Sequence, residues 1–139
     1  MRIFRTGGRY AYAMCDLERR ILDLIKKHGI DRFNQLAAEI KDVSEVLMRR
    51  AIQRIPDGEY SSEGYLEDDG VIPDRPWKIR ATLVVREDEI IVDYNGSDEQ
   101  AAGAINQSFG TTASSTYAGV FHMVDEDIPW NHGAYRPIS

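Results

Sequence analysis

The sequence is poor in cysteine and histidine. Cys15 is the only cysteine among 139 residues, which excludes an intrachain disulfide and a zinc site built on several cysteines. The histidines, His28, His122 and His132, show none of the spacings of a helical or hairpin metal site. We therefore expect no metal ion and no cofactor bound by this chain alone, and a reducing compartment fits its cysteine content.

Basic charge and long apolar runs are also scarce. The formal net charge is −6, and acidic segments flank the one cluster of cations between Arg49 and Arg54, so a surface that follows a nucleic-acid backbone is not expected. No run is long enough for a transmembrane helix, and the first 14 residues lack the apolar core of a signal peptide. The sequence therefore predicts a cytoplasmic protein that binds neither nucleic acid nor membrane.

Several catalytic signatures are missing. There is no Gly-x-Ser-x-Gly elbow, no P-loop and no dinucleotide fingerprint. Cys15 fits a structural or exposed thiol better than a nucleophile. Adjacent carboxylates such as Asp68 and Asp69 fit solvated loop charges. We therefore assign no catalytic residue from these patterns.

What is present fits one α+β domain over residues 1–139. The hydrophobic fraction of 42% and charged fraction of 29% are those of an ordinary globular protein. Residues 1–15 lack a clear period and form a predicted lead-in. We expect residues 16–55 to be helical, residues 56–97 mainly β, and residues 98–139 to form a polar loop, a helix and an irregular end.

Two helices are predicted in the first part. Asp16 is a suitable N-cap and Gly29 a suitable left-handed stop. A second helix is expected from Asp31 to about Arg54, before Pro56, with an optional break near residues 42–44. Its predicted core-facing stripe contains seven apolar side chains: Phe33, Leu36, Ala37, Ile40, Val43, Leu47 and Ala51.

A hairpin and a third helix follow. Alternating apolar residues on both sides of Glu87-Asp88 predict an antiparallel hairpin, and Glu59 to Gly64 predict a short edge strand. Thr111 or Thr112 is the expected cap of a C-terminal helix. The fold class is therefore α+β, with a helical pair, a hairpin or small sheet, and a last helix.

The stretch DYNGSDEQAAGAINQSFG, residues 93–110, is unusually rich in neutral polar groups. Asp93 stands at a strand end, and the stretch then offers amides and hydroxyls in a glycine-permissive backbone, from Asn95, Ser97, Gln100, Asn106, Gln107 and Ser108. Such groups orient an amide or carbonyl at lower desolvation cost than charged groups. From the residues alone, a structural turn remains ahead of a binding site.

An ordered set of segments resembles the hydantoinase B/oxoprolinase family. It comprises IPDG at 55–58, VDYNGS at 92–97, the step from Gly103 to Asn106, and the run from Asn131 to Ile138, within a resembling region from Asp16 to Ser139. That family includes the B component of ATP-dependent hydantoinases, the corresponding part of 5-oxoprolinase, and a subunit of acetone and acetophenone carboxylases.

The resemblance implies a function shared with other subunits. A kinase-like A-type partner would use ATP to activate a cyclic amide or ketone, and the B part would complete ring opening or carboxylation. The resemblance implies substrate-binding roles for five residues: Asp93, Ser97, Asn106 and, more weakly, Asn131 and Arg136. It implies ATP and a divalent metal ion in the full assembly only.

The resemblance also has departures. Family B chains are several times longer, and their metal-binding segment has no counterpart here, so we expect an internal or truncated portion that is inactive alone. The substrate stays open between hydantoin, 5-oxoproline and a ketone, and a homo-oligomer is also possible. The alternatives are a carboxylase-branch subunit and a non-catalytic assembly module.

Overall fold

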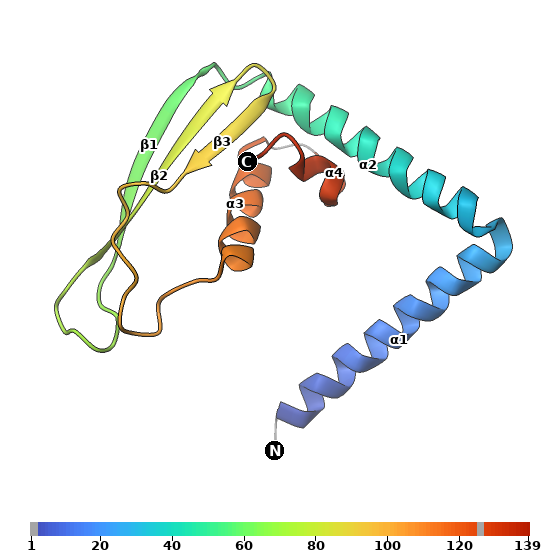
Figure 1. Ribbon diagram of the computed structural model, residues 1–139, viewed down its shortest axis with the longest axis horizontal. Coiled ribbons are helices and arrows are strands. Elements are labelled where there is room, and N and C mark those ends of the chain that lie inside the picture. The colour runs from blue at the N-terminus through green and yellow to red at the C-terminus, as the bar shows by residue number, and fades with distance from the viewer. Residues whose placement is uncertain (1–2, 125–126) are drawn as a thin grey trace. The chain divides into compact units, whose positions relative to one another are not determined.

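The computed structural model describes residues 3–124 and 127–139, and its elements confirm an α+β fold (Figure 1). Their order is α1 (Ile3–His28), α2 (Ile30–Ile52), β1 (Gly58–Leu66), β2 (Trp77–Arg86), β3 (Glu89–Asp93), α3 (Phe109–Val124) and α4 (His132–Tyr135). The chain divides into two compact units, Met1–Ile40 and Lys41–Ser139. No helix in the described ranges is both long and apolar enough to cross a membrane.

Helix α1 begins at Ile3, so the expectation of a lead-in over residues 1–15 is wrong for its described part. An apolar period reports burial of one face, so the lack of a clear period does not exclude a helix. Asp16 therefore lies within the helix and is not its N-cap. Its carboxylate pairs with Arg19 at 2.6 Å and Arg20 at 2.7 Å, the neighbours one turn along the helix.

A single residue separates α1 from α2. Gly29 has φ +82°, the left-handed conformation that glycine adopts without steric cost, so the predicted stop is confirmed. Helix α2 then runs to Ile52 without the optional break near residues 42–44.

The face of α2 that enters the core differs from the predicted stripe. Ala51 is buried as expected and Leu47 packs against the core, but Ile40 and Val43 are each 57% exposed. The buried positions are Ser44, Met48, Ala51 and Ile52, which keep helical spacing on a rotated face. The sequence period identified the helix, whereas the packing partners decide which face is covered.

The sheet is antiparallel in the order β1-β2-β3. The predicted turn at Glu87-Asp88 is confirmed, with Glu87 at φ 53°. The predicted edge strand is confirmed as β1, all of whose residues are exposed. The expected apolar face of β2 is covered only near the turn: Val85 is 1% exposed, whereas Ile79 is 45% exposed.

The core joins the end of α2 to the β2–β3 hairpin, α3 and α4. Met48, Ile52, Val85 and Ile90 are at most 1% exposed, and the rest of the cluster comprises Ala51, Val120, Phe121, Ile128, Ala134 and Ile138. Helices α3 and α4 lie beside the hairpin in Figure 1.

Two C-terminal expectations need correction. Helix α3 starts at Phe109, and Ser108 precedes it with its hydroxyl 3.4 Å from the backbone N of Thr111, so neither Thr111 nor Thr112 is the cap. The end predicted to be irregular contains α4, whose N-cap is Asn131, and Ile138 forms a parallel bridge with Ile90. Long-range contacts supply this order, and a local pattern cannot report them.

Candidate functional site

The stretch from Asp93 begins as a tight turn. The Asp93 carboxylate accepts a hydrogen bond from the backbone N–H of Asn95 at 2.9 Å, and Ser97 N–H donates to the Tyr94 carbonyl at 3.2 Å. Gly96 adopts φ +91°, which an L side chain rarely allows. Asp93 therefore shapes the turn that directs the following loop.

Ser97 continues the sheet after β3 has ended. Its hydroxyl accepts from Arg80 N–H at 2.9 Å and donates to Arg80 carbonyl oxygen at 3.1 Å. Asp98 pairs in a similar way with Lys78. Its carboxylate accepts from Lys78 N–H at 2.8 Å, and its backbone N–H donates to the Lys78 carbonyl oxygen at 2.9 Å. These side chains substitute for a strand along the start of β2.

Asn106 closes the loop on itself. Its side-chain oxygen accepts from Ala101 N–H at 2.9 Å, and its NH₂ group donates to the carbonyls of Ala101 at 2.8 Å and Gly103 at 3.0 Å. The amide therefore satisfies three backbone groups at once, which fixes the curvature of the loop.

Asp69 anchors the same loop from the β1–β2 connection. It is only 4% exposed, so the expectation of a solvated charge is wrong. Its carboxylate accepts from Val71, Ile72 and Gly103 N–H groups at 2.7 to 3.0 Å. The hydrogen bond from Ile72, with those from Val71 and Gly103, lowers the Asp69 pKa against the opposing effect of burial.

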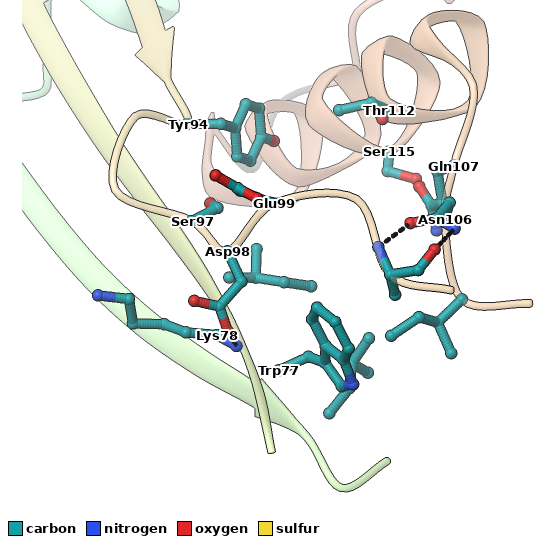
Figure 2. A pocket seen from close by; sticks show the side chains of 14 residues that line it. Trp77, Lys78, Tyr94, Ser97, Asp98, Glu99, Asn106, Gln107, Thr112 and Ser115 are labelled. Atoms are coloured by element: carbon teal, nitrogen blue, oxygen red, sulfur yellow. Dashed lines mark hydrogen bonds between the residues drawn. The ribbon is translucent and has the colours of Figure 1, made fainter. Parts of the chain in front are cut away.

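A cavity of about 480 Å³ lies between the start of β2, this loop and α3. Figure 2 shows its labelled polar side chains arranged around the opening. Its lining comprises Leu66, Trp77, Lys78, Ile79, Tyr94, Ser97, Asp98, Glu99, Ala101, Ile105, Asn106, Gln107, Thr112 and Ser115. We call this space the Trp77 cavity. Its mixed apolar and polar wall is typical of small-molecule sites.

The polar groups of the Trp77 cavity fall into two classes. Ser97, Asp98, Asn106 and Tyr94 are engaged within the chain, the last through a 2.7 Å contact with the Thr116 hydroxyl. The side chains of Gln107, Ser115 and Glu99 have no hydrogen-bond partner among the described residues. The second class is therefore available to a ligand.

Trp77 is the least satisfied residue of the cavity. It is 5% exposed, and its Nε1 is buried with no hydrogen-bond partner, a situation that costs about 1–3 kcal/mol. The Arg75 guanidinium lies 3.9 Å from the centroid of the indole. Trp77 was not predicted as a site residue from the sequence, although a tryptophan that opens a strand beside a polar loop is a usable signal.

Asn131 and Arg136 lie elsewhere, at α4 and the adjoining part of α2. Asn131 accepts from Gly133 N–H at 2.8 Å and donates to the Ser44 hydroxyl at 2.7 Å. Arg136 binds Asp42 at 2.8 Å and Glu45 at 2.7 Å. The structure thus brings Ser97 and Asn106 together at the Trp77 cavity, places Asp93 just before it, and separates Asn131 and Arg136 from it.

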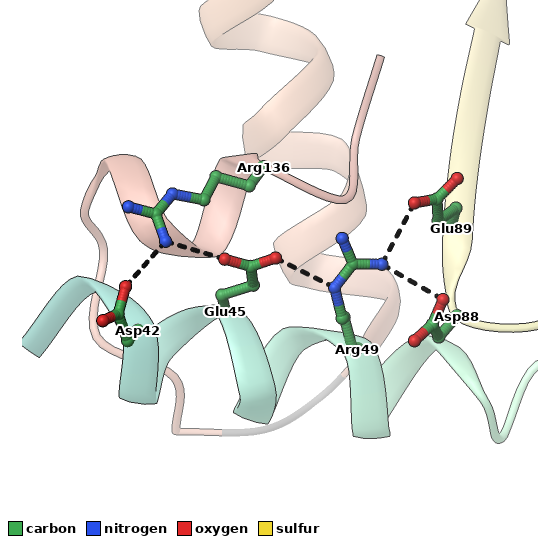
Figure 3. A network of polar contacts seen from close by, with 6 residues as sticks. All are labelled: Asp42, Glu45, Arg49, Asp88, Glu89 and Arg136. Carbon is green, nitrogen blue, oxygen red and sulfur yellow. Dashed lines mark hydrogen bonds and ion pairs between the residues drawn. The ribbon is translucent and has the colours of Figure 1, made fainter. Parts of the chain in front are cut away.

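Figure 3 shows the ion-pair network around Arg136. Glu45 links Arg136 to Arg49, which also reaches Asp88 at 3.1 Å and Glu89 at 3.2 Å. Hydrogen bonds from Arg136 and then from Arg49 lower the pKa of Glu45. The network ties α2 to the β2–β3 turn and to α4, and every guanidinium in it faces a carboxylate.

A metal ion is not supported by the side chains present. Across residues 3–124 and 127–139, no three His, Cys, Asp or Glu side chains converge as a ligand set. The carboxylate of Asp69 is already directed at backbone N–H groups. The described residues therefore do not fit the divalent ion that the resemblance implies, and we derive no chemical step from one.

Comparisons with known proteins place the chain within one family. The sequence model of the hydantoinase B/oxoprolinase family matches residues 11–139. Among curated proteins, the chain is 32% identical over 140 residues to the beta subunit of caprolactamase from Pseudomonas jessenii, covering 99% of this chain and 24% of the relative. It is 30% identical over 131 residues to a protein of Pseudomonas sp. (strain NS671) assigned as the B component of a D-/L-hydantoinase, covering 87% and 22%.

A solved structure agrees with these sequence matches. The crystal structure of ATP-dependent caprolactamase from Pseudomonas jessenii matches all of this chain and 24% of its own chain, with a TM-score of 0.83 at 31% identity. The chain therefore spans about a quarter of the length of the relatives it matches.

Proposed function

The chain belongs to the hydantoinase B/oxoprolinase family, and from this membership we propose that it forms part of the B component of an ATP-dependent enzyme that opens a cyclic amide. A kinase-like A-type subunit is its proposed partner and the consumer of ATP. The observation that carries the proposal is the match of the whole chain to ATP-dependent caprolactamase at a TM-score of 0.83.

The chemistry explains why two components are needed. An unstrained amide is a poor electrophile, and phosphorylation of its oxygen provides a leaving group. The reaction also needs a site that orients the lactam ring and limits access of bulk water. We assign this chain to orientation and shielding, and we assign no nucleophile or general base to it.

The loop of residues 93–110 supplies the proposed wall of that site. Its amide and hydroxyl groups at Ser97 and Asn106 hold the loop against β2 and close its curvature, while Gln107 and Ser115 face the Trp77 cavity with no partner among the described residues. Asp93, Ser97 and Asn106 thus act by positioning the wall. Asn131 and Arg136 lie outside the cavity and are proposed only as contacts to another part of the assembly.

We further propose that the chain has no turnover alone. Its relatives are about four times as long, and the described residues hold no metal ligand set. The divalent ion of the full assembly would then be bound by other polypeptide, and the cytoplasm is the proposed compartment because the kinase-like partner uses ATP.

Reconstitution tests this function. The tagged chain is incubated with ATP in extract of its native cells, and bound proteins are identified by mass spectrometry. A recovered kinase-like subunit, together with any complementary B-type polypeptide, is then purified and assayed for ring opening of ε-caprolactam and hydantoin. We expect turnover that requires both ATP and this chain. Equal turnover when the chain is omitted would refute the proposal.

A non-catalytic assembly module is the second candidate. It is favoured by the apolar side chains exposed in the first unit, including Leu17 at 53%, Ile30 at 51% and Ile40 at 57%, since exposed apolar surface marks interaction sites. Under this alternative, variants of the Trp77 cavity leave the turnover of the assembly unchanged, whereas polar substitutions of Leu17 and Ile30 prevent assembly.

A further inference from the structure

The Trp77 cavity contains a buried donor that the fold does not use. Trp77 is 5% exposed, and its Nε1 has no partner. An indole nitrogen donates one hydrogen bond and accepts none, so only an acceptor atom can satisfy it. The N–H is shielded from water in this structure, so a ligand acceptor reaches it only after a local rearrangement of the cavity wall.

Gln107 presents a second pattern of donor and acceptor. Its primary amide carries a carbonyl and an NH₂ group side by side, and neither has a partner among the described residues. In a lactam ring of seven or fewer atoms the peptide bond is held cis, so its N–H and C=O point to the same edge. A primary amide matches that edge with two parallel hydrogen bonds.

The charges around the cavity select against anions. Asp98 and Glu99 face it with carboxylates. Lys78 is the one cation among the lining residues, and its ammonium lies 3.8 Å from Glu63, while the Arg75 guanidinium is stacked on the indole of Trp77. The apolar part of the wall is formed by Leu66, Ile79, Ala101 and Ile105 around the indole of Trp77. A neutral ring with one polar edge fits these surroundings better than a carboxylate or a phosphate.

We propose that the Trp77 cavity binds a neutral, unphosphorylated cyclic amide, with Gln107 pairing with the cis-amide edge and Trp77 contacting the ring and donating to an acceptor. The choice of ligand rests on the proposed function. The site itself rests on the unpartnered groups and on the space between them. Gln107 is therefore the specificity-determining residue of the cavity, whereas Ser97 and Asn106 support its wall.

The two tryptophans make the site directly observable. Trp77 and Trp130 are the only tryptophans in the sequence, and Trp130 lies outside the cavity, packed on Phe121 and 60% exposed. Titration of the ¹⁵N-labelled chain with ε-caprolactam should shift the indole N–H signal of Trp77 and leave that of Trp130 unchanged. We expect a dissociation constant on the order of 1 mM, as for a weak small ligand.

Ligand analogues test the chemistry of recognition. Cycloheptanone has the same ring size and a carbonyl but no N–H, so it should bind at least about tenfold more weakly, the effect of losing one good hydrogen bond. The anion 5-oxoproline should bind more weakly than ε-caprolactam because of Asp98 and Glu99. Equal binding of the ketone and the lactam would overturn the pairing assigned to Gln107.

Matched variants separate the site from the fold. Gln107→Ala removes an exposed side chain that lines the cavity, and Gln100→Ala removes the same group from the same loop outside it. We expect about tenfold weaker binding for Gln107→Ala and no change for Gln100→Ala. Trp77→Phe keeps an aromatic wall without the N–H and should also weaken binding, which the side-chain amide signals of Gln107 report in that variant. Absence of any Trp77 shift in the unmodified chain, or equal binding by both glutamine variants, would overturn the proposal.

This experiment needs neither ATP nor a partner, so its failure is distinct from failure of the proposed function. A shift of Trp77 in the chain alone, combined with an inactive reconstituted assembly, supports the cavity and removes the proposed reaction. Unchanged turnover of an assembly carrying Gln107→Ala, combined with no binding to the chain, removes the cavity and leaves the reaction in place.

Discussion

The units Met1–Ile40 and Lys41–Ser139 are ordered by different contacts. In the first, no side chain from Met14 to Ile40 is buried, and the helices carry ion pairs between neighbours on one helix, such as Asp16 with Arg19 and Arg20. In the second, Met48, Ile52 and Ile90 are fully buried in one core. Local helix geometry accounts for the first unit, whereas the second depends on contacts between segments far apart in the sequence.

The candidate site belongs to only one of the two units. The Trp77 cavity is built entirely from the second unit, where loop side chains replace strand and helix contacts. The first unit presents apolar side chains such as Leu17 and Ile30 to its surroundings. We therefore expect substitutions in the second unit to change folding and binding, and those in the first to act on association.

The largest expected effect contrasts Met48→Ala with Leu17→Ala. Met48 is 0% exposed, so its truncation leaves a cavity and should lower the free energy of unfolding of the second unit by about 2–5 kcal/mol. Leu17 is 53% exposed, and alanine is a better helix former. Leu17→Ala should therefore leave this free energy of unfolding nearly unchanged. Urea unfolding followed by tryptophan fluorescence measures both. The control is Val46→Ala, an exposed position on the helix that carries Met48. A comparable loss for Leu17→Ala would contradict the contrast.

A smaller effect is expected where the loop passes Asp69. A Cβ atom at Gly103 would overlap the Asp69 backbone carbonyl, so Gly103→Ala should destabilise the second unit by about 1–3 kcal/mol, as overpacking does. Gly110→Ala is the matched control, because a Cβ there meets nothing within 4 Å and the residue lies in α3. The control should be neutral or stabilising by up to about 1 kcal/mol. The thermal midpoint of Gly103→Ala should therefore fall, whereas that of Gly110→Ala should stay or rise. Equal shifts would contradict the close contact between Gly103 and the Asp69 backbone.

Asn131→Ala compares a structural role with a binding role for a residue that the resemblance placed in the substrate site. Its side chain caps α4 and reaches Ser44, and loss of such a cap costs about 1 kcal/mol. Asn34→Ala, exposed in the first unit, should change stability by no more than about 0.5 kcal/mol. Chemical denaturation of both variants gives these values. If Asn131→Ala instead left stability intact and lowered the turnover of a reconstituted assembly, its role would be in binding.

The sequence alone predicted the parts of the fold that depend on neighbouring residues. Gly29 marks the break between helices, Glu87-Asp88 marks the hairpin turn, and the α+β class follows from the periods. The bonds from Asp69 to Gly103 and from Asn131 to Ser44 could not be predicted, because each joins segments far apart in the sequence. The same reason explains the rotated face of α2: its period is local, but the surfaces that cover it are not.

The sequence indicated which loop lines the candidate site, but not which side chains of the site are unpartnered. The polar loop does line a cavity, yet Ser97 and Asn106 bond to backbone groups, and the free groups belong to Gln107, Ser115 and Trp77. A sequence shows which side chains can form hydrogen bonds. It does not show which of them the fold has already satisfied.

Asp69→Asn is the most conservative of these substitutions, because it keeps the shape of the side chain and one acceptor oxygen. The second carboxylate oxygen receives Gly103 N–H, and replacing it with an NH₂ group opposes two donors, so Asp69→Asn should be less stable than the unmodified chain at neutral pH. Hydrogen bonds from Ile72, Val71 and Gly103 lower the Asp69 pKa in the fold. The stabilisation by ionised Asp69 is therefore fully present above the ordinary aspartate pKa of about 4 and is lost as pH falls through the lower folded value.

Urea midpoints of Asp69→Asn and the unmodified chain should therefore differ by a constant amount from pH 8 to about pH 5 and converge below about pH 4. Asp68→Asn is the control for charge, because exposed Asp68 accepts only the N–H of Gly70 among the described residues, and its midpoint should stay closer to that of the unmodified chain at neutral pH. Midpoints for Asp69→Asn that run parallel to the unmodified chain down to pH 2 would show that the carboxylate is not held ionised by the loop. The loop that lines the Trp77 cavity would then be held in shape by the hydrogen bonds of Asn106 to Ala101 and Gly103, without an ionised anchor from the β1–β2 connection.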